Sequence, residues 1–116
     1  MNTHGIEVVR TELAQWKMLL LYKWLLVKPG YELTQTDYNH EGDHLVQQRE
    51  TYIIGFYLWY AVEFIFKFLA TWSWNRAYRS VSFEQEAYSF ENCDNWLQLR
   101  QRCHWRHYIF TLNVEH

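Results

Sequence analysis

Residues 40–44, His-Glu-Gly-Asp-His, are the stretch of this sequence whose residue types and spacing point most directly to chemistry. On a helix, side chains four positions apart lie on one face, so the imidazoles of His40 and His44 can converge on one metal ion. Glu41 then projects beside the metal and can take a proton from a zinc-bound water. A catalytic zinc site supplies three protein ligands and leaves the fourth position to water. The pattern therefore predicts a zinc site whose third protein ligand comes from elsewhere in the chain.

The residues around this motif predict a zinc helix over about residues 36–50. Thr36 or Asp37 can cap its N-terminus, and the sequence continues from Leu45 without a helix breaker. Gly42, inside the motif, costs about 1 kcal/mol of helix stability relative to alanine. The simplest alternative is that the two histidines are exposed residues of a polar helix and bind no metal.

Length and composition indicate a single domain with one modest hydrophobic core. The chain has 116 residues, of which 20% are aromatic, so large amphipathic side chains must fill a core, line a groove or meet a membrane interface. The net charge of −2 argues against a nucleic-acid-binding protein. Two cysteines are too few for a disulfide framework, and no signal-peptide pattern opens the sequence. We therefore expect a cytoplasmic protein, with membrane association as the alternative.

The N-terminal part predicts one strand and little else. Residues 1–16 are weakly helical by pattern. The apolar residues at helical spacing there are Ile6, Val9 and Leu13. The apolar run over residues 19–27 is interrupted by Lys23 and followed by Pro29-Gly30, which favours a strand with one buried face.

Residues 52–74 are almost entirely apolar and aromatic and form the hydrophobic centre of the sequence. Their length would nearly span a bilayer, but Glu63 and Lys67, four positions apart near the centre, are costly in hydrocarbon. We expect an aromatic helix over about residues 52–73 that is buried or half-buried in the core. A helix that lies on or dips into a membrane is the alternative. Glu63 is a candidate to reach the metal, although pairing with Lys67 is its simpler role.

A third helix is predicted over about residues 83–101, after a polar connection. Ser82 and Gln85 have the spacing of a capping box, which marks a helix start. The candidate core residues of this helix are Phe83, Ala87, Phe90 and Leu97. The stripe that can face the zinc helix holds Glu84, Tyr88 and Glu91.

The C-terminal part offers a rival set of metal ligands. Its members are Cys93, Cys103, His104 and His107. Their spacing matches no usual zinc ribbon or zinc finger, so an aromatic surface helix is the simpler interpretation.

Four segments, in this order, resemble a family of short, uncharacterised bacterial zincin-like proteins. They are Asn39-His40-Glu41-x-x-His44 with Gln47-Gln48, then Phe56-Tyr57-Leu58-Trp59-Tyr60, then Ala77-Tyr78-Arg79, and last Phe83-Glu84-x-Glu86-Ala87-Tyr88. The resemblance covers roughly residues 19–110. More distantly, a zinc helix followed by a Glu-x-x-Ala helix is similar to the gluzincin metallopeptidases, whose third ligand is the glutamate three positions before the alanine.

The resemblance to gluzincins implies that Glu84 is the third zinc ligand. Glu86 is the alternative, because it neighbours the same alanine. The two positions differ by about 200° around a helix, so only one of them can face the metal. Gly42 and Asp43 stand where such families often carry a larger apolar residue.

The resulting hypothesis is a minimal gluzincin-type zinc peptidase with a mainly α fold, an α+β arrangement being the alternative. The three predicted helices pack together, with room for one small N-terminal strand pair. Zn²⁺ is held by His40, His44 and Glu84, while Glu41 serves as general base toward a peptide or protein substrate. Candidates to stabilise an oxyanion are Tyr88, His104 and His107. Candidates to orient the histidines are Asn39, Asp43 and Glu91.

Two other functions stay open at this point. One is a membrane-associated or partner-binding helical module with a structural or inactive zinc site, using residues 52–74 as its binding surface. The other is a zinc-dependent hydrolase that acts on something other than a peptide.

Overall fold

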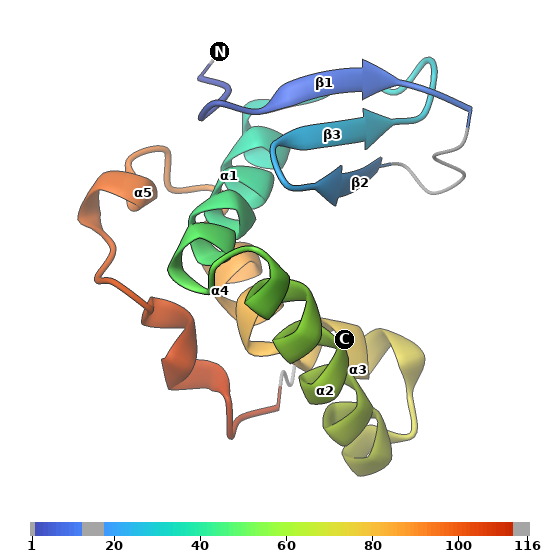
Figure 1. Cartoon of the computed structure of the whole chain (residues 1–116), viewed down its shortest axis with the longest axis vertical. Coiled ribbons are helices and arrows are strands. Elements are labelled where there is room, and N and C mark those ends of the chain that lie inside the picture. The colour runs from blue at the N-terminus through green and yellow to red at the C-terminus, as the bar shows by residue number, and fades with distance from the viewer. Residues whose placement is uncertain (1, 13–17, 113–116) are drawn as a thin grey trace.

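The computed structural model describes residues 2–12 and 18–112 (Figure 1). Over these residues the chain forms a three-stranded sheet, five α-helices and a short 3₁₀ helix, η1. The strands are β1 (Glu7–Arg10), β2 (Met18–Leu21) and β3 (Trp24–Val27), and the helices are α1 (Gln35–Glu50), α2 (Ile54–Thr71), α3 (Trp74–Ser80), α4 (Ser82–Phe90), α5 (Trp96–Leu99) and η1 (His104–Tyr108). The predicted fold class, mainly α with a small strand element, is confirmed.

The sheet has the strand order β1-β3-β2, with β1 parallel and β2 antiparallel to β3. The strand predicted over residues 19–27 is in fact the hairpin of β2 and β3, turning at Tyr22, whose φ of 52° is left-handed. The weak helix predicted at the N-terminus is wrong for residues 7–10, which form β1, whereas Leu13 lies outside the described residues. Val8 packs on the core while Val9 is exposed, and this period of two is that of a strand.

Helix α1 lies between the sheet and α4 and presents a different face to each. Leu45 joins the apolar cluster of Leu25 and Val27 on the sheet side. The other buried residues of α1 are polar side chains and one glycine, namely Asn39, His40, Gly42, Asp43, His44, Gln47 and Gln48. The N-cap is Thr34, two residues before Thr36 and three before Asp37, and Asp37 closes the capping box with it. The sheet lies at one end of the molecule and α2 with α3 at the other, so α1 and α4 meet near its middle (Figure 1).

Helix α2 was predicted to be buried or half-buried in the core, and the structure buries one face of it while most of its residues are exposed. Its buried residues are Phe56, Glu63 and Lys67. Glu63 does not reach the histidines, because its carboxylate accepts hydrogen bonds from both the backbone N–H and the Oγ of Ser82, each at 2.6 Å. Glu63 therefore satisfies the N-terminus of α4 from a neighbouring helix.

The segment before α4 is helix α3 rather than a polar connection, and the two helices are separated at Val81. The predicted capping box at Ser82 is wrong, since Ser82 is the first residue of α4 and its hydroxyl bonds to Glu63. Helix α4 ends at Phe90, well short of residue 101. The following Asn-Cys-Asp-Asn run favours turns, because these short polar side chains compete for backbone hydrogen bonds. Of the predicted core residues, Phe83 and Ala87 are buried, while Phe90 and Leu97 are half-buried.

Arg100 ties the C-terminal segment to α1 and α4. Its guanidinium lies 2.8 Å from Glu86, 2.9 Å from Glu50 and 3.3 Å from Asp43. Burial, and then a hydrogen bond shared with Glu86, raise the pKa of Asp43 well above its usual range. This raised pKa reduces the repulsion among the three carboxyl groups that share one cation in the interior.

Gly42 is required by the approach of the N-terminal segment to α1. A Cβ at position 42 would lie 2.9 Å from Cβ of His4, which is closer than two carbon atoms pack. His4 has a left-handed φ of 53° and its Nε2 lies 2.9 Å from Oδ1 of Asn39. This contact gives a structural reason for the glycine inside the His-Glu-x-x-His motif.

Gly42→Ala is therefore expected to destabilise the protein, although in an exposed helix the same change would stabilise by about 1 kcal/mol. In a His4→Gly background, which removes the clashing atoms and suits the left-handed backbone, Gly42→Ala is expected to stabilise instead. Chemical denaturation of the four proteins measures this coupling. An equal effect of Gly42→Ala in both backgrounds would contradict the proposed packing.

Candidate metal centre

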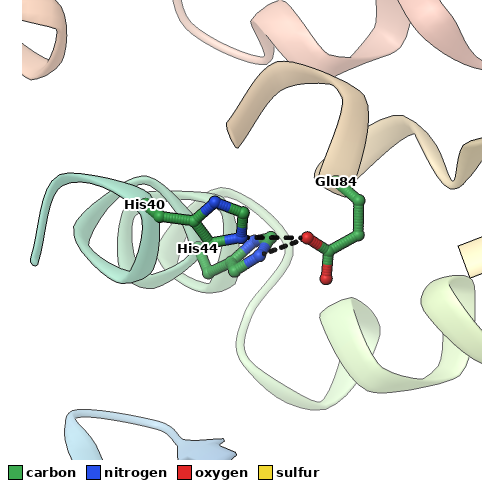
Figure 2. Close-up of side chains that lie close together, drawn as sticks. All are labelled: His40, His44 and Glu84. Carbon is green, nitrogen blue, oxygen red and sulfur yellow. Dashed lines mark hydrogen bonds and ion pairs between the residues drawn. The ribbon is translucent and has the colours of Figure 1, made fainter. Parts of the chain in front are cut away.

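Three side chains that can bind a metal converge where α1 meets α4 (Figure 2). His40 and His44 lie one turn apart on α1, and Glu84 lies in the first turn of α4. Glu84 Oε1 is 3.0 Å from Nε2 of His40 and 3.1 Å from Nε2 of His44. All three residues are buried, and their three ligand atoms lie within 4.8 Å of one another.

The donor atoms of the cluster could hold a divalent metal ion. Zinc bonds to nitrogen and oxygen at about 2.0–2.2 Å, so tetrahedral ligand atoms stand roughly 3.3 Å apart. The two distances from Glu84 to the imidazoles are close to that spacing. Two imidazoles and one carboxylate form a set that suits zinc and also other first-row metals. Without a metal, the Glu84 oxygen accepts hydrogen bonds from both rings.

Glu86 does not belong to this cluster. Its carboxylate bonds to Arg100 and to the indole N–H of Trp96 on the other side of α4. The separation of Glu84 and Glu86 around the helix places one at the histidines and the other at the guanidinium. Of the two candidates for third ligand, the structure brings only Glu84 to the histidines.

The electrostatics of the cluster couple the carboxylate to both rings. Burial alone would raise the pKa of Glu84, but the charge of His44 and hydrogen bonds from both imidazoles hold that pKa well below its usual range. Burial alone would lower the pKa of His40, yet its bonds to Glu84 and Glu91 raise that pKa well above the ordinary value. Burial alone would lower the pKa of His44, but the charge of Glu84 and its hydrogen bond together raise that pKa above the ordinary value. In the metal-free protein the imidazoles therefore hold protons that a metal must displace.

The tautomer of His44 is set by Gln47. The amide Nε2 of Gln47 donates to the backbone oxygen of Phe83 at 3.1 Å, so its Oε1 must face His44. His44 Nδ1 then donates to that oxygen at 2.8 Å, which leaves Nε2 directed at Glu84. Such outer hydrogen bonds fix the orientation of a metal-binding histidine. Sequence analysis gave Gln47 no role, although its position three residues after His44 places both on one helix face.

His40 is held in the same way by Glu91, one of the three predicted candidates. Its Nδ1 donates to Glu91 Oε2 at 3.0 Å. Asn39 does not bond to either ring, but its Nδ2 donates to the backbone oxygen of Glu91 and to Asp94, and so supports the loop that carries Glu91. The third candidate, Asp43, is occupied by Arg100 and Glu86 and orients neither histidine.

Tyr60 on α2 holds the second oxygen of Glu84. Its hydroxyl donates to Glu84 Oε2 at 2.8 Å, which leaves Oε1 directed at the imidazoles. The motifs of the sequence did not single out Tyr60 for this role. The available signal was its position four residues after Phe56, which puts both on the inner face of α2.

Glu41 lies beside the two histidines at the wall of a cavity of about 560 Å³. The other lining residues are His44, Met18, Leu19, Leu20, Phe56, Tyr57, Tyr60, Ala61, Trp74, Asn75 and Tyr78. Burial raises the pKa of Glu41, and the charges of His44 and His40 oppose this only in part. A raised pKa moves a carboxylate toward the range in which it exchanges protons with substrates near neutral pH.

The remaining predicted site residues lie elsewhere. Among the described residues, the cluster of His40, His44 and Glu84 is the one group with metal-binding geometry, so the rival set of cysteines and histidines is not assembled. His104 and His107 are not among the residues that line the cavity. Tyr88 packs edge-on against His40 and shares a hydrogen bond with Tyr78, whose side chain lines the cavity in its place.

Comparison of the chain with protein-family models, with curated proteins and with solved structures gives no match. We therefore infer a function from the geometry of the cluster and its cavity.

Proposed function

We propose that this protein is a zinc-dependent hydrolase, with His40, His44 and Glu84 as ligands and Glu41 as general base. The observation that carries the proposal is that three buried ligand atoms converge beside a cavity whose wall includes both His44 and Glu41. A structural zinc site is normally closed by four protein ligands, whereas a catalytic site has three and stays open to substrate.

The chain's own residues account for the steps around the metal. When bound, zinc would polarise a carbonyl group and activate a water molecule. Glu41 accepts a proton and returns it to the leaving group. The hydroxyl of Tyr78 stays protonated at neutral pH, because burial and then the charge of Glu84 raise its pKa, so it can donate to an anionic oxygen in the cavity.

A peptide is the substrate class that the surroundings of the cavity favour. Strand β2 contributes three of the lining residues, and over the described part of the chain β3 is its one neighbour in the sheet. An edge strand can pair with an extended peptide through backbone hydrogen bonds. A peptide bound there would pass the apolar wall formed by α2.

Metal content tests the ligand assignment. The purified wild type is expected to bind one zinc ion, Glu84→Gln to lose it, and the matched variant Glu86→Gln to keep it, because only Glu84 faces the histidines. Elemental analysis after dialysis, with circular dichroism as a check on folding, measures this. Zinc retained by a folded Glu84→Gln variant would contradict the assignment.

Glu41→Gln tests catalysis separately from metal binding. This variant is expected to keep its zinc but to lose about 10²- to 10⁴-fold of the hydrolysis rate, the usual contribution of a general base. The measurement is cleavage of an unfolded protein substrate by mass spectrometry, with chelation as the control. Cleavage by Glu41→Gln at the wild-type rate, or by the chelated protein, would contradict the mechanism.

The charge coupling in the cluster predicts opposite pH dependences for metal uptake and metal-free stability. The raised histidine pKa values stabilise the metal-free fold below about pH 6.5, the unfolded value, and this contribution is lost as pH rises through the raised values. The lowered pKa of Glu84 stabilises the metal-free fold above about pH 4.3, the unfolded value. This stabilisation is lost as the pH falls toward the lowered pKa of the folded state. The affinity for zinc should rise with pH, by up to roughly 100-fold per pH unit if both imidazoles release a proton. Competition with a chromophoric chelator measures this affinity, and an affinity that does not change between about pH 6 and 8 would contradict the prediction.

A further inference from the structure

The outer face of α2 is the largest apolar surface among the described residues. Over the described part of the chain, 18 large hydrophobic residues are exposed, and 11 of them lie between Tyr52 and Trp74. Those along α2 itself are Ile54, Tyr57, Leu58, Trp59, Val62, Ile65, Phe66 and Leu69. Soluble monomers rarely leave so many neighbouring apolar side chains uncovered.

We propose that this face binds the surface of an anionic lipid membrane, with α2 lying in the plane of the interface. This binding is separate from the proposed hydrolysis and does not depend on it.

The charged residues of α2 explain why the helix lies on a membrane rather than crosses it. By length and mean hydropathy α2 could span a bilayer. Glu63 and Lys67 both turn inward, where Glu63 holds Ser82 and Lys67 donates to backbone oxygens of Ser80 and Tyr108. A spanning helix would break these bonds and place two charges in hydrocarbon. The outward face, in contrast, carries no charged side chain over residues 54–71.

The charges that remain near this face favour an anionic surface. Over residues 54–80 the charged residues are Glu63, Lys67, Arg76 and Arg79. Glu63 and Lys67 pair with each other inside, so the net positive charge of this segment comes from the two half-buried arginines of α3, which packs against α2. Of these, Arg79 stacks on the ring of Tyr88. Aromatic residues also end the apolar stripe, with Tyr52 at one end and Trp72 with Trp74 at the other, as is typical at a membrane interface.

The apolar face continues to the cavity. Leu19, Tyr57 and Trp74 are exposed on the surface and also line the cavity. A lipid surface that covers the face would therefore lie at the mouth of the proposed active site.

A second copy of the chain is the main rival occupant. A protein interface of standard size uses roughly 20–30 residues of all types on each side, with a polar rim around an apolar core, whereas the outward face of α2 has no charged side chain over residues 54–71. The face also lacks the mixed charges that usually set the register of a protein interface.

Flotation of the purified full chain with lipid vesicles tests the proposal. The vesicles contain phosphatidylcholine with or without phosphatidylserine. The chain offers a matched pair of variants, because Leu58 on α2 is 65% exposed and Leu99 on α5 is 64% exposed. Leu58→Glu is expected to lower binding roughly tenfold or more, and Leu99→Glu to leave it unchanged. Arg76→Gln is expected to weaken binding to the phosphatidylserine vesicles and to leave binding to pure phosphatidylcholine unchanged.

Three results would overturn the proposal. The first is a wild type that does not float with either vesicle. The second is an equal loss of binding in Leu58→Glu and Leu99→Glu, with both variants folded by circular dichroism. The third is a wild-type dimer, detected by light scattering, that Leu58→Glu converts to a monomer while no form of the chain floats; this result would assign the face to self-association.

Discussion

The polar contact between α1 and α4 is the constraint on which the rest of the structure depends. At that contact α1 buries His40, His44 and Gln47, and α4 buries Glu84 against them. Polar groups withdrawn from water are stable only when each finds a partner, and removal of one partner leaves another charge uncompensated. The neighbouring elements supply those partners. Each bond that satisfies a buried group also fixes the direction of a metal-binding atom.

Helix α4 separates two clusters of charged side chains, one around the histidines and one around Arg100. Glu84 and Glu86 are two residues apart, yet one meets the imidazoles and the other meets Arg100. Asp43 lies next to His44 in sequence but belongs to the Arg100 side. The guanidinium pairs with Asp43, Glu50 and Glu86 and thereby connects the segment after α5 to α1 and α4, the two helices that form the candidate metal centre.

The two faces of helix α2 differ in their contacts: the inner face bonds to α4, and the outer face is exposed and apolar. Its inner face positions the centre through Tyr60, which holds Glu84, and through Glu63, which holds the first turn of α4. Because both of its charged residues are used inside, its outer face is left apolar. The proposed hydrolytic centre and the proposed lipid surface are therefore two consequences of one helix.

The sequence by itself determined what local periodicity can specify. It predicted a mainly helical fold and the helix that carries His40 and His44 on one face, because these features depend on residues three or four positions apart. The choice between Glu84 and Glu86 as third ligand was implied by the resemblance to gluzincins. Only the tertiary structure brought Glu84 to the histidines, placed Gln47 against His44 and Tyr60 against Glu84, and exposed the outer face of α2. Those outcomes depend on contacts between residues tens of positions apart in the chain. No local pattern specifies which of two adjacent helix faces will meet a distant partner.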